Sequence, residues 1–346
     1  MKAAVLYGRG DLRIESVGVP VLEPGEVLLR TKAALTCGTD AKVYRRGYHA
    51  RMIVPPAVFG HEISGVVEEA GPGVEGLEPG TPVVVANSAP CGACEFCRRG
   101  RESLCDDLLF WNGAYAELAR IPARIVARNL LRLPVGLDFR AAAMTEPLAC
   151  VVRGVEESRV SPGQSVAVIG VGSIGQMLVA LCRLRGAVVT AVGRNPERLE
   201  RAREMGAASV VTAEAGEDLG RRLLEASPGG RGFEVVIEAA GQADTSEASL
   251  VAARKGGTVN LFAGCSDGTR LGVDAHRLHY EEVKVASTFH HTPASFRESL
   301  RLIVEGEVDP RRFVTGEAPL ERLPEILQEM GQGGKGLKTA IVPAGA

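Results

Sequence analysis

The sequence predicts an α/β protein with two domains, an antiparallel β domain followed by a doubly wound parallel sheet. The chain has 346 residues, of which 45% are hydrophobic and 24% charged. At roughly 150 residues per domain, this length suggests about two domains, each able to bury its own core. Up to about residue 145, short β-branched runs alternate with Pro and Gly turns. From about residue 162, strands alternate with glycine turns and amphipathic helices.

Charge and aromatic content argue against a nucleic-acid partner. The chain has 40 Lys and Arg against 42 Asp and Glu, and only 4% of its residues are aromatic. Such a chain lacks the positive excess and the stacking side chains that nucleic-acid binding uses. No apolar run approaches the roughly 18 residues of a membrane span, and the first residues lack the apolar core of a signal peptide. We therefore expect a cytoplasmic protein with no membrane segment.

The amino-terminal third has a sequence pattern typical of an antiparallel sheet. The runs VLLRT (27–31), SGVVEEA (64–70) and TPVVVA (81–86) are short, rich in β-branched residues and bounded by turns. This spacing is typical of an all-β domain.

The next part of the chain repeats strand, turn and helix, which builds a parallel sheet through right-handed crossovers. About six strands are predicted, because the apolar runs have the length of buried parallel strands. They lie at 165–170, 188–193, 209–212, 234–238 and 258–262, with one more near Val285. Beyond it the pattern predicts helices at 295–305 and 320–330 and a terminal strand, LKTAIVP.

A GxGxxG turn formed by Gly170, Gly172 and Gly175 lies between the first of these strands and a helix. In a dinucleotide site the first glycine makes the tight turn, the second admits the pyrophosphate, and the third lets helix and strand pack closely. The pyrophosphate then faces the helix N-terminus. We therefore predict a nicotinamide-dinucleotide site here, with Ser173 and Ile174 as further contacts.

The end of the second strand points to the phosphorylated cofactor. An Asp or Glu that would hold the ribose hydroxyls of NAD is replaced by Gly193 and Arg194. A glycine leaves room for a 2′-phosphate and an arginine pairs with it, so NADP is predicted over NAD, with Arg198 as a second contact. The alternative is that Arg194 is a solvated residue at a helix start.

Cysteines cluster in a pattern that predicts a structural zinc site. Cytosolic thiols are kept reduced, so eight cysteines favour metal binding over disulfides. Four of them, Cys91, Cys94, Cys97 and Cys105, are separated by two, two and seven residues. Four thiolates can close a tetrahedron around zinc and leave no open position. Unligated thiols or a redox CxxC pair are alternatives, but no strand-helix pattern frames these cysteines.

A second group of residues suits a catalytic zinc ion. Cys37 lies in LTCGTD, His61 and Glu62 lie in GHEISG, and Glu146 lies in MTEPLAC. A thiolate, an imidazole and one or two carboxylates bind catalytic zinc and keep one position open. By its spacing alone, His61 is equally well explained as a core histidine.

The order of these motifs resembles that of the zinc-dependent medium-chain dehydrogenases over nearly the whole chain. It looks closest to the polyol branch, with sorbitol and threonine dehydrogenases, because EPL places a glutamate where classical alcohol dehydrogenases have a cysteine ligand. The resemblance implies a GroES-like β-barrel catalytic domain of residues 1–147 and 288–346, with its structural zinc lobe at 91–105. It also implies a Rossmann domain of residues 148–287 and a homotetramer or homodimer.

The same resemblance implies roles for individual residues. Cys37 and His61, with Glu146 or Glu62, would hold the catalytic zinc, and Thr39 would pass the alcohol proton outward. The family often has a histidine three residues further along, where this chain has Lys42. Phe289 resembles a residue that lines the nicotinamide.

Together, the glycine turn, the two metal-binding groups and the family resemblance predict an oxidoreductase. It would transfer a hydride between a small secondary alcohol, such as a polyol or sugar alcohol, and NADP. Within the family, a threonine-type or simple secondary-alcohol dehydrogenase using NAD is the alternative. Two remoter alternatives are a zinc-free reductase of the same superfamily and a non-enzymatic zinc-binding regulator.

Overall fold

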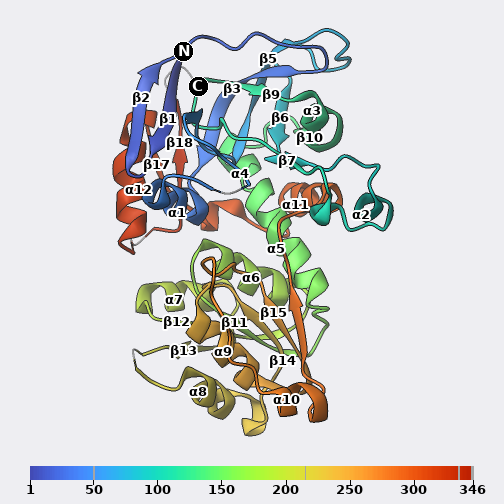
Figure 1. Ribbon diagram of the computed structural model, residues 1–346, viewed down its shortest axis with the longest axis vertical. Helices are drawn as coiled ribbons and strands as arrows, with labels where there is room; N and C mark the ends of the chain where they lie inside the picture. The colour runs from blue at the N-terminus through green and yellow to red at the C-terminus, as the bar shows by residue number, and fades with distance from the viewer. Residues whose placement is uncertain (50, 215, 334–335, 344–346) are drawn as a thin grey trace. The chain divides into compact units, whose positions relative to one another are not determined.

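The computed structural model describes residues 1–49, 51–214, 216–333 and 336–343 (Figure 1). The chain forms two compact units, the first built from residues 1–149 and 291–346, the second from residues 150–290. The chain first passes from the first unit to the second within helix α5 (Thr145–Glu157). Among the described residues, no helix has the length and hydropathy that crossing a membrane requires.

The first unit is built mainly of antiparallel β structure, as the turn spacing predicts. Its strands are β1 (Lys2–Gly8), β2 (Asp11–Ser16), β3 (Val27–Leu35), β4 (Ala57–Val58), β5 (Ile63–Ala70), β6 (Pro82–Val85), β7 (Ser88–Ala89), β8 (Leu109–Phe110), β9 (Leu118–Ile121), β10 (Leu130–Arg132), β17 (Val314–Ala318) and β18 (Lys338–Ile341). The largest sheet has the order β10-β6-β5-β3-β18-β17, with β9 pairing to β3. The strands of the tail therefore belong to this unit's sheet.

Short helices complete the first unit. They are α1 (Gly38–Arg46), α2 (Glu95–Arg98), α3 (Ala123–Asn129), α4 (Phe139–Ala143), α11 (Pro293–Val304) and α12 (Leu323–Gly331). A single helix was expected over 320–330, but the structure has a 3₁₀ turn at Leu320–Arg322 before α12. Pro324 explains the break, because a proline is tolerated only in the first turn of an α-helix.

The second unit is a doubly wound parallel sheet of six strands in the order β13-β12-β11-β14-β15-β16. The strands are β11 (Ser165–Ile169), β12 (Val188–Gly193), β13 (Ser209–Thr212), β14 (Phe233–Glu238), β15 (Ala253–Leu261) and β16 (Lys284–Ser287). Helices α6 (Ser173–Leu184), α7 (Pro196–Glu204), α8 (Leu219–Ala226), α9 (Ala243–Ala252) and α10 (Ala275–Tyr280) connect them. All five residues of β11 are buried, as a central parallel strand requires.

The register of this sheet places the ends of its strands side by side. Ile169 lies opposite Val192 on one side and Glu238 on the other, and Leu261 lies opposite Ser287. The strands therefore end at one edge, where the turns after β11, β12 and β16 follow. The strand order reverses between β11 and β14, which is where ligands bind in sheets of this kind.

Two glycines of the GxGxxG turn differ in the space around them. A Cβ at Gly175 would lie 1.7 Å from the carbonyl oxygen of Gly170, whereas a Cβ at Gly172 would meet no atom within 4 Å. The backbone carbonyl cannot move aside, so Gly175 has a packing role that Gly172 does not share.

We predict that Gly175→Ala lowers the free energy of unfolding by at least about 3 kcal/mol, because backbone would have to shift to admit the methyl group. Gly172→Ala is the matched control, and its cost should stay within about 1 kcal/mol as a change at a helix N-cap. Urea unfolding of the two variants measures the difference. Equal stabilities would contradict this packing role.

Candidate functional site

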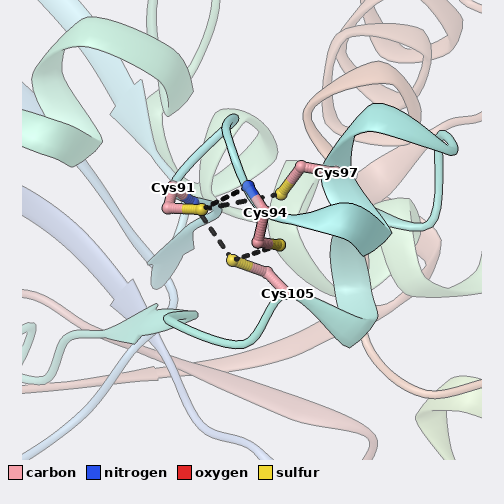
Figure 2. Close-up of side chains that lie close together, drawn as sticks. All are labelled: Cys91, Cys94, Cys97 and Cys105. Atoms are coloured by element: carbon pink, nitrogen blue, oxygen red, sulfur yellow. Dashed lines mark hydrogen bonds between the residues drawn. The ribbon is translucent and has the colours of Figure 1, made fainter.

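The four clustered cysteines point their sulfur atoms toward one another (Figure 2). The Sγ atoms of Cys91 and Cys97 are 4.0 Å apart, and those of Cys94 and Cys105 are 3.8 Å apart. All four sulfur atoms lie within 4.8 Å of one another. Zinc–sulfur bonds of about 2.3 Å in a tetrahedron place sulfur atoms about 3.8 Å apart. The geometry therefore fits one zinc ion.

Backbone amides stabilise thiolates in this lobe. The N–H groups of Ala93 and Cys94 donate to Cys91 Sγ at 3.4 and 3.3 Å, and they lower the pKa of Cys91 to about 6. The N–H of Cys91 donates to Cys105 Sγ at 3.2 Å. Burial, in contrast, raises the pKa of Cys97 to about 12. A full set of thiolates at neutral pH therefore needs a bound cation.

A second metal-binding group is formed by Cys37, His61 and Glu62, whose ligand atoms lie within 4.8 Å of one another. Cys37 is the N-cap residue of α1, and the other two residues lead into β5. Burial acts to raise the pKa of the Cys37 thiol, but the positive charges of Lys338 and His61 outweigh it and lower the pKa to about 7. The thiol is thus prepared to ionise and bind a metal.

Asp40 connects two members of this group. One carboxylate oxygen lies 3.0 Å from His61 Nδ1, and the other accepts the backbone N–H of Cys37 at 3.0 Å. Burial acts to lower the pKa of His61, but the charges of Asp40 and Cys37 raise it well above its ordinary value. A carboxylate on Nδ1 leaves Nε2 for a metal and fixes the orientation of the ring.

Glu62 forms a buried ion pair with Lys338, a residue of β18. Both carboxylate oxygens lie 2.6 Å from Lys338 Nζ, which also donates to the carbonyl of Thr36 at 3.0 Å. The two side chains are at most 1% exposed. Burial acts to lower the pKa of Lys338, but the charges of Glu62 and Cys37 raise it, so the lysine stays charged.

Glu146 lies in the first turn of α5 and is 4% exposed. Burial raises its pKa to about 7, although the charge of His61 opposes this. One oxygen of Glu146 lies 3.7 Å from Nε2 of His291, which is 2.9 Å from Asn87 Oδ1. Among the described residues, the compact group around Cys37 contains Glu62 and does not contain Glu146.

Two further residues of the predicted proton path lie on α1. Thr39 is half-buried in its first turn, next to Asp40. Lys42, one turn further on, is exposed. Residues three apart share one face of a helix, so Thr39 and Lys42 point the same way along α1.

The glycine turn has the geometry of a dinucleotide site. Gly170 adopts φ = +106°, and a Cβ there would lie 3.0 Å from the backbone of Ala239. The open space at Gly172 leaves room for a ligand to approach the backbone. Ser173 and Ile174 form the first turn of α6 and are half-buried.

At the end of β12, Gly193 is required by packing, since a Cβ there would lie 2.2 Å from Val171 Cγ2. Arg194 follows it and is exposed, whereas Arg198 on α7 is half-buried. The backbone of Arg198 is fixed at both ends: its N–H donates to Asn195 Oδ1 at 3.0 Å, and its carbonyl accepts from Gln176 at 2.7 Å. Two guanidinium groups therefore follow this strand end.

Phe289 follows β16 at the same edge of the sheet and is 41% exposed. Its carbonyl accepts from Arg153 Nη1 at 2.5 Å. The backbone of this segment is therefore held to α5 within the second unit, which leaves the phenylalanine ring partly exposed.

Sequence reasoning missed three residues that the structure brings to the site: Asp40, Tyr115 and Lys338. Asp40 stands in the CGTD motif itself, where an acid three residues after a cysteine could have been identified as a partner for it. A lysine in the apolar LKTAIV strand is a signal of a buried charge pair. Nothing near Tyr115 in the sequence indicates its partner.

Two family models match the chain. Residues 23–134 match the alcohol dehydrogenase GroES-like domain, and residues 173–305 match the zinc-binding dehydrogenases. These matches confirm the predicted fold class, a GroES-like domain with a Rossmann-type parallel sheet.

Individual relatives cover nearly the whole chain. Sorbitol dehydrogenase of Bacillus subtilis is 27% identical over 95% of this chain and 93% of its own. The 2-dehydro-3-deoxy-L-galactonate 5-dehydrogenase of Pseudoalteromonas atlantica is 30% identical over 99% of this chain and 98% of its own. A solved structure of a Sinorhizobium meliloti protein bound to NADP is 29% identical, covers 99% of each chain and has a TM-score of 0.89.

We predict that Lys338→Met lowers the free energy of unfolding by about 3–5 kcal/mol, because it leaves the Glu62 carboxylate buried without its cation. Burial already raises the pKa of Glu62 in the folded state although Lys338 opposes it, and losing that cation raises the pKa further above its value in the unfolded chain. The deficit is therefore full above the raised pKa and shrinks as the pH falls through it.

Urea unfolding at several pH values measures this deficit. The double variant Glu62→Gln/Lys338→Met is the control, and it should recover most of the loss. A deficit that grows on acidification would contradict the ion pair.

Proposed function

We propose a function from one premise: the chain belongs to the zinc-dependent medium-chain dehydrogenase family, within its polyol branch. It is an oxidoreductase. Our proposal is that it transfers a hydride between a secondary alcohol, a polyol or sugar alcohol, and NADP. The observation that carries this proposal is the group of Cys37 and His61, both held by Asp40. The polyol relatives support the substrate class.

We assign the zinc and substrate chemistry to residues 1–147 and 288–346, and the cofactor to residues 148–287. The ligands proposed for the catalytic zinc are Cys37, His61 and Glu146, bound directly or through water. Glu62 is the less suitable carboxylate, because Lys338 contacts both of its oxygens at 2.6 Å. A second, structural zinc is proposed for Cys91, Cys94, Cys97 and Cys105.

Zinc in the first site supplies a Lewis acid that lowers the pKa of the substrate alcohol. In our proposal, Thr39 accepts the alcohol proton and passes its own to solvent along the exposed face of α1, since Lys42, where the family often has a histidine, is a cation without an acceptor. Asp40 keeps Cys37 and His61 in place during this transfer. The protein thus orients the alcohol and provides an exit for the proton.

The nicotinamide cofactor supplies the hydride acceptor. We propose that the backbone at Gly170, Gly172, Ser173 and Ile174 binds its pyrophosphate, since Gly172 leaves the approach open. Arg194 would pair with a 2′-phosphate, with Arg198 as the second cation, and the ring of Phe289 would contact the nicotinamide. NADP preference follows from these arginines and from Gly193 and Arg194, which stand at the end of β12 where NAD sites have an acid. The homotetramer or homodimer and the cytoplasmic location stay predictions.

Metal analysis tests the two zinc sites. The purified protein should contain about two zinc ions per chain, and Cys37→Ser should contain about one and reduce no cofactor. Cys97→Ser is the matched variant of the other group and should also lose one ion. Two ions in Cys37→Ser would contradict the catalytic site.

An absorbance assay tests the reaction and the cofactor together. The zinc-loaded protein is mixed with NADP⁺ or NAD⁺ and a panel of polyols, sugar alcohols, simple secondary alcohols and threonine. We expect kcat/KM with NADP⁺ to exceed that with NAD⁺, and Arg194→Asp to lose at least about tenfold with NADP⁺ only, since it removes a bidentate phosphate contact.

A clear preference for NAD⁺ would overturn the role of Arg194 while leaving the dehydrogenase assignment. Turnover confined to threonine would overturn the polyol assignment. An unchanged NADP⁺ preference in Arg194→Asp would show that other residues select the cofactor.

A further inference from the structure

We propose that Tyr115 is a positioning residue for the catalytic zinc, acting through Asp40 on both Cys37 and His61. The inference rests on the zinc ligands proposed above. Tyr115 does not itself touch the metal; it strengthens zinc binding by holding Asp40.

The contacts form a short chain of polar groups. The hydroxyl of Tyr115 lies 2.6 Å from one oxygen of Asp40, the oxygen that also accepts the N–H of Cys37 at 3.0 Å. The other Asp40 oxygen lies 3.0 Å from His61 Nδ1. Asp40 therefore accepts two hydrogen bonds, from the backbone of Cys37 and from Tyr115, and its other oxygen pairs with the imidazole of His61. Two of these three partners belong to proposed zinc ligands, and the third is Tyr115.

Burial makes the Tyr115 hydroxyl important. Asp40 is 1% exposed and Tyr115 is fully buried, so bulk water does not take the place of the hydroxyl. A buried carboxylate needs its hydrogen bonds, and bonds to a charged acceptor are the stronger ones. Without the tyrosine hydroxyl, the carboxylate is held only by the groups that it has to orient.

The tyrosine ring itself is locked in place by the residue before His61. Gly60 adopts φ = +91°, and a Cβ there would lie 2.5 Å from Tyr115 Cδ2. The N–H of Tyr115 donates to the carbonyl of Phe59 at 2.9 Å, and the rings of Phe59 and Tyr115 meet edge to face with centroids 5.9 Å apart. The ring thus lies on the Gly60 backbone and reaches Asp40 from a fixed position.

A competing explanation is purely structural. The Tyr115 hydroxyl also lies 2.9 Å from the carbonyl of Leu35, the last residue of β3. A single hydroxyl proton cannot be fully donated to both acceptors at once. If the Leu35 bond were the important one, loss of the hydroxyl would weaken the sheet and leave zinc binding alone.

Tyr115→Phe separates the two explanations, because it removes only the hydroxyl. Zinc affinity is measured on the zinc-free full chain by competition with a chromogenic chelator, with the four-cysteine lobe as internal control. Changing the direct partner of a metal ligand typically costs about 10–100-fold in affinity. Because Tyr115 acts one residue further out, we expect a smaller loss, about 3–10-fold, at the catalytic site and none at the lobe.

Two comparisons make the test specific. Ser64→Ala removes another buried hydroxyl of the same unit, which bonds the carbonyl of Phe139, and should change neither zinc affinity. In an Asp40→Asn background, Tyr115→Phe should have little further effect, since two residues acting through one path are not additive.

Unchanged zinc affinity in Tyr115→Phe would overturn the inference. So would an equal loss at both zinc sites, or an undiminished loss in the Asp40→Asn background, because each points to the Leu35 bond or to general destabilisation. If Cys37→Ser keeps both zinc ions, the proposed ligand set fails. The inference then fails with it, for that distinct reason.

Discussion

One buried carboxylate, Asp40, organises the candidate metal site. Removing a charge from water is costly unless hydrogen bonds replace the lost solvation. Here the backbone of Cys37 and the hydroxyl of Tyr115 donate hydrogen bonds to one oxygen, and the imidazole of His61 pairs with the other. The same carboxylate contacts α1 at its start and the turn before β5, so it connects Cys37 and His61, which come from separate parts of the chain.

A second constraint is the tight packing of the glycine turn. Gly170, Gly175 and Gly193 have no room for a side chain against Ala239, the turn itself and Val171, respectively. Gly172 alone among these faces open space. The turn therefore combines a rigid support with one exposed stretch of backbone at the end of β11, which is the arrangement that a pyrophosphate requires.

Local patterns in the sequence were sufficient to predict most of the architecture. The strand at 209–212 and the six-stranded parallel sheet are confirmed, because each buried parallel strand is a short apolar run between turns. The grouping of the four cysteines could be predicted equally well, since they lie within 15 residues of the chain. These features could be predicted because the residues that form each of them are near neighbours in the chain.

The polar partners of the metal site could not be predicted, because they depend on long-range contacts. Lys338 is 276 residues from Glu62, and Tyr115 is 75 residues from Asp40. Only the assembled sheet brings β18 beside β3 and places Tyr115 against Gly60. For the same reason, the sequence left two glutamates as equal candidates and did not indicate that Glu62 pairs with Lys338 while Glu146 lies near His291.

In the function proposed above, Cys37 and His61 bind zinc at a site separate from the cysteine lobe. Anomalous diffraction at the zinc edge from crystals of the zinc-loaded protein tests this most directly. We expect two peaks per chain, one enclosed by the four cysteines and one about 2.3 Å from Cys37 Sγ and about 2.1 Å from His61 Nε2. A peak at the lobe alone, with His61 Nε2 bound to protein atoms, would contradict it.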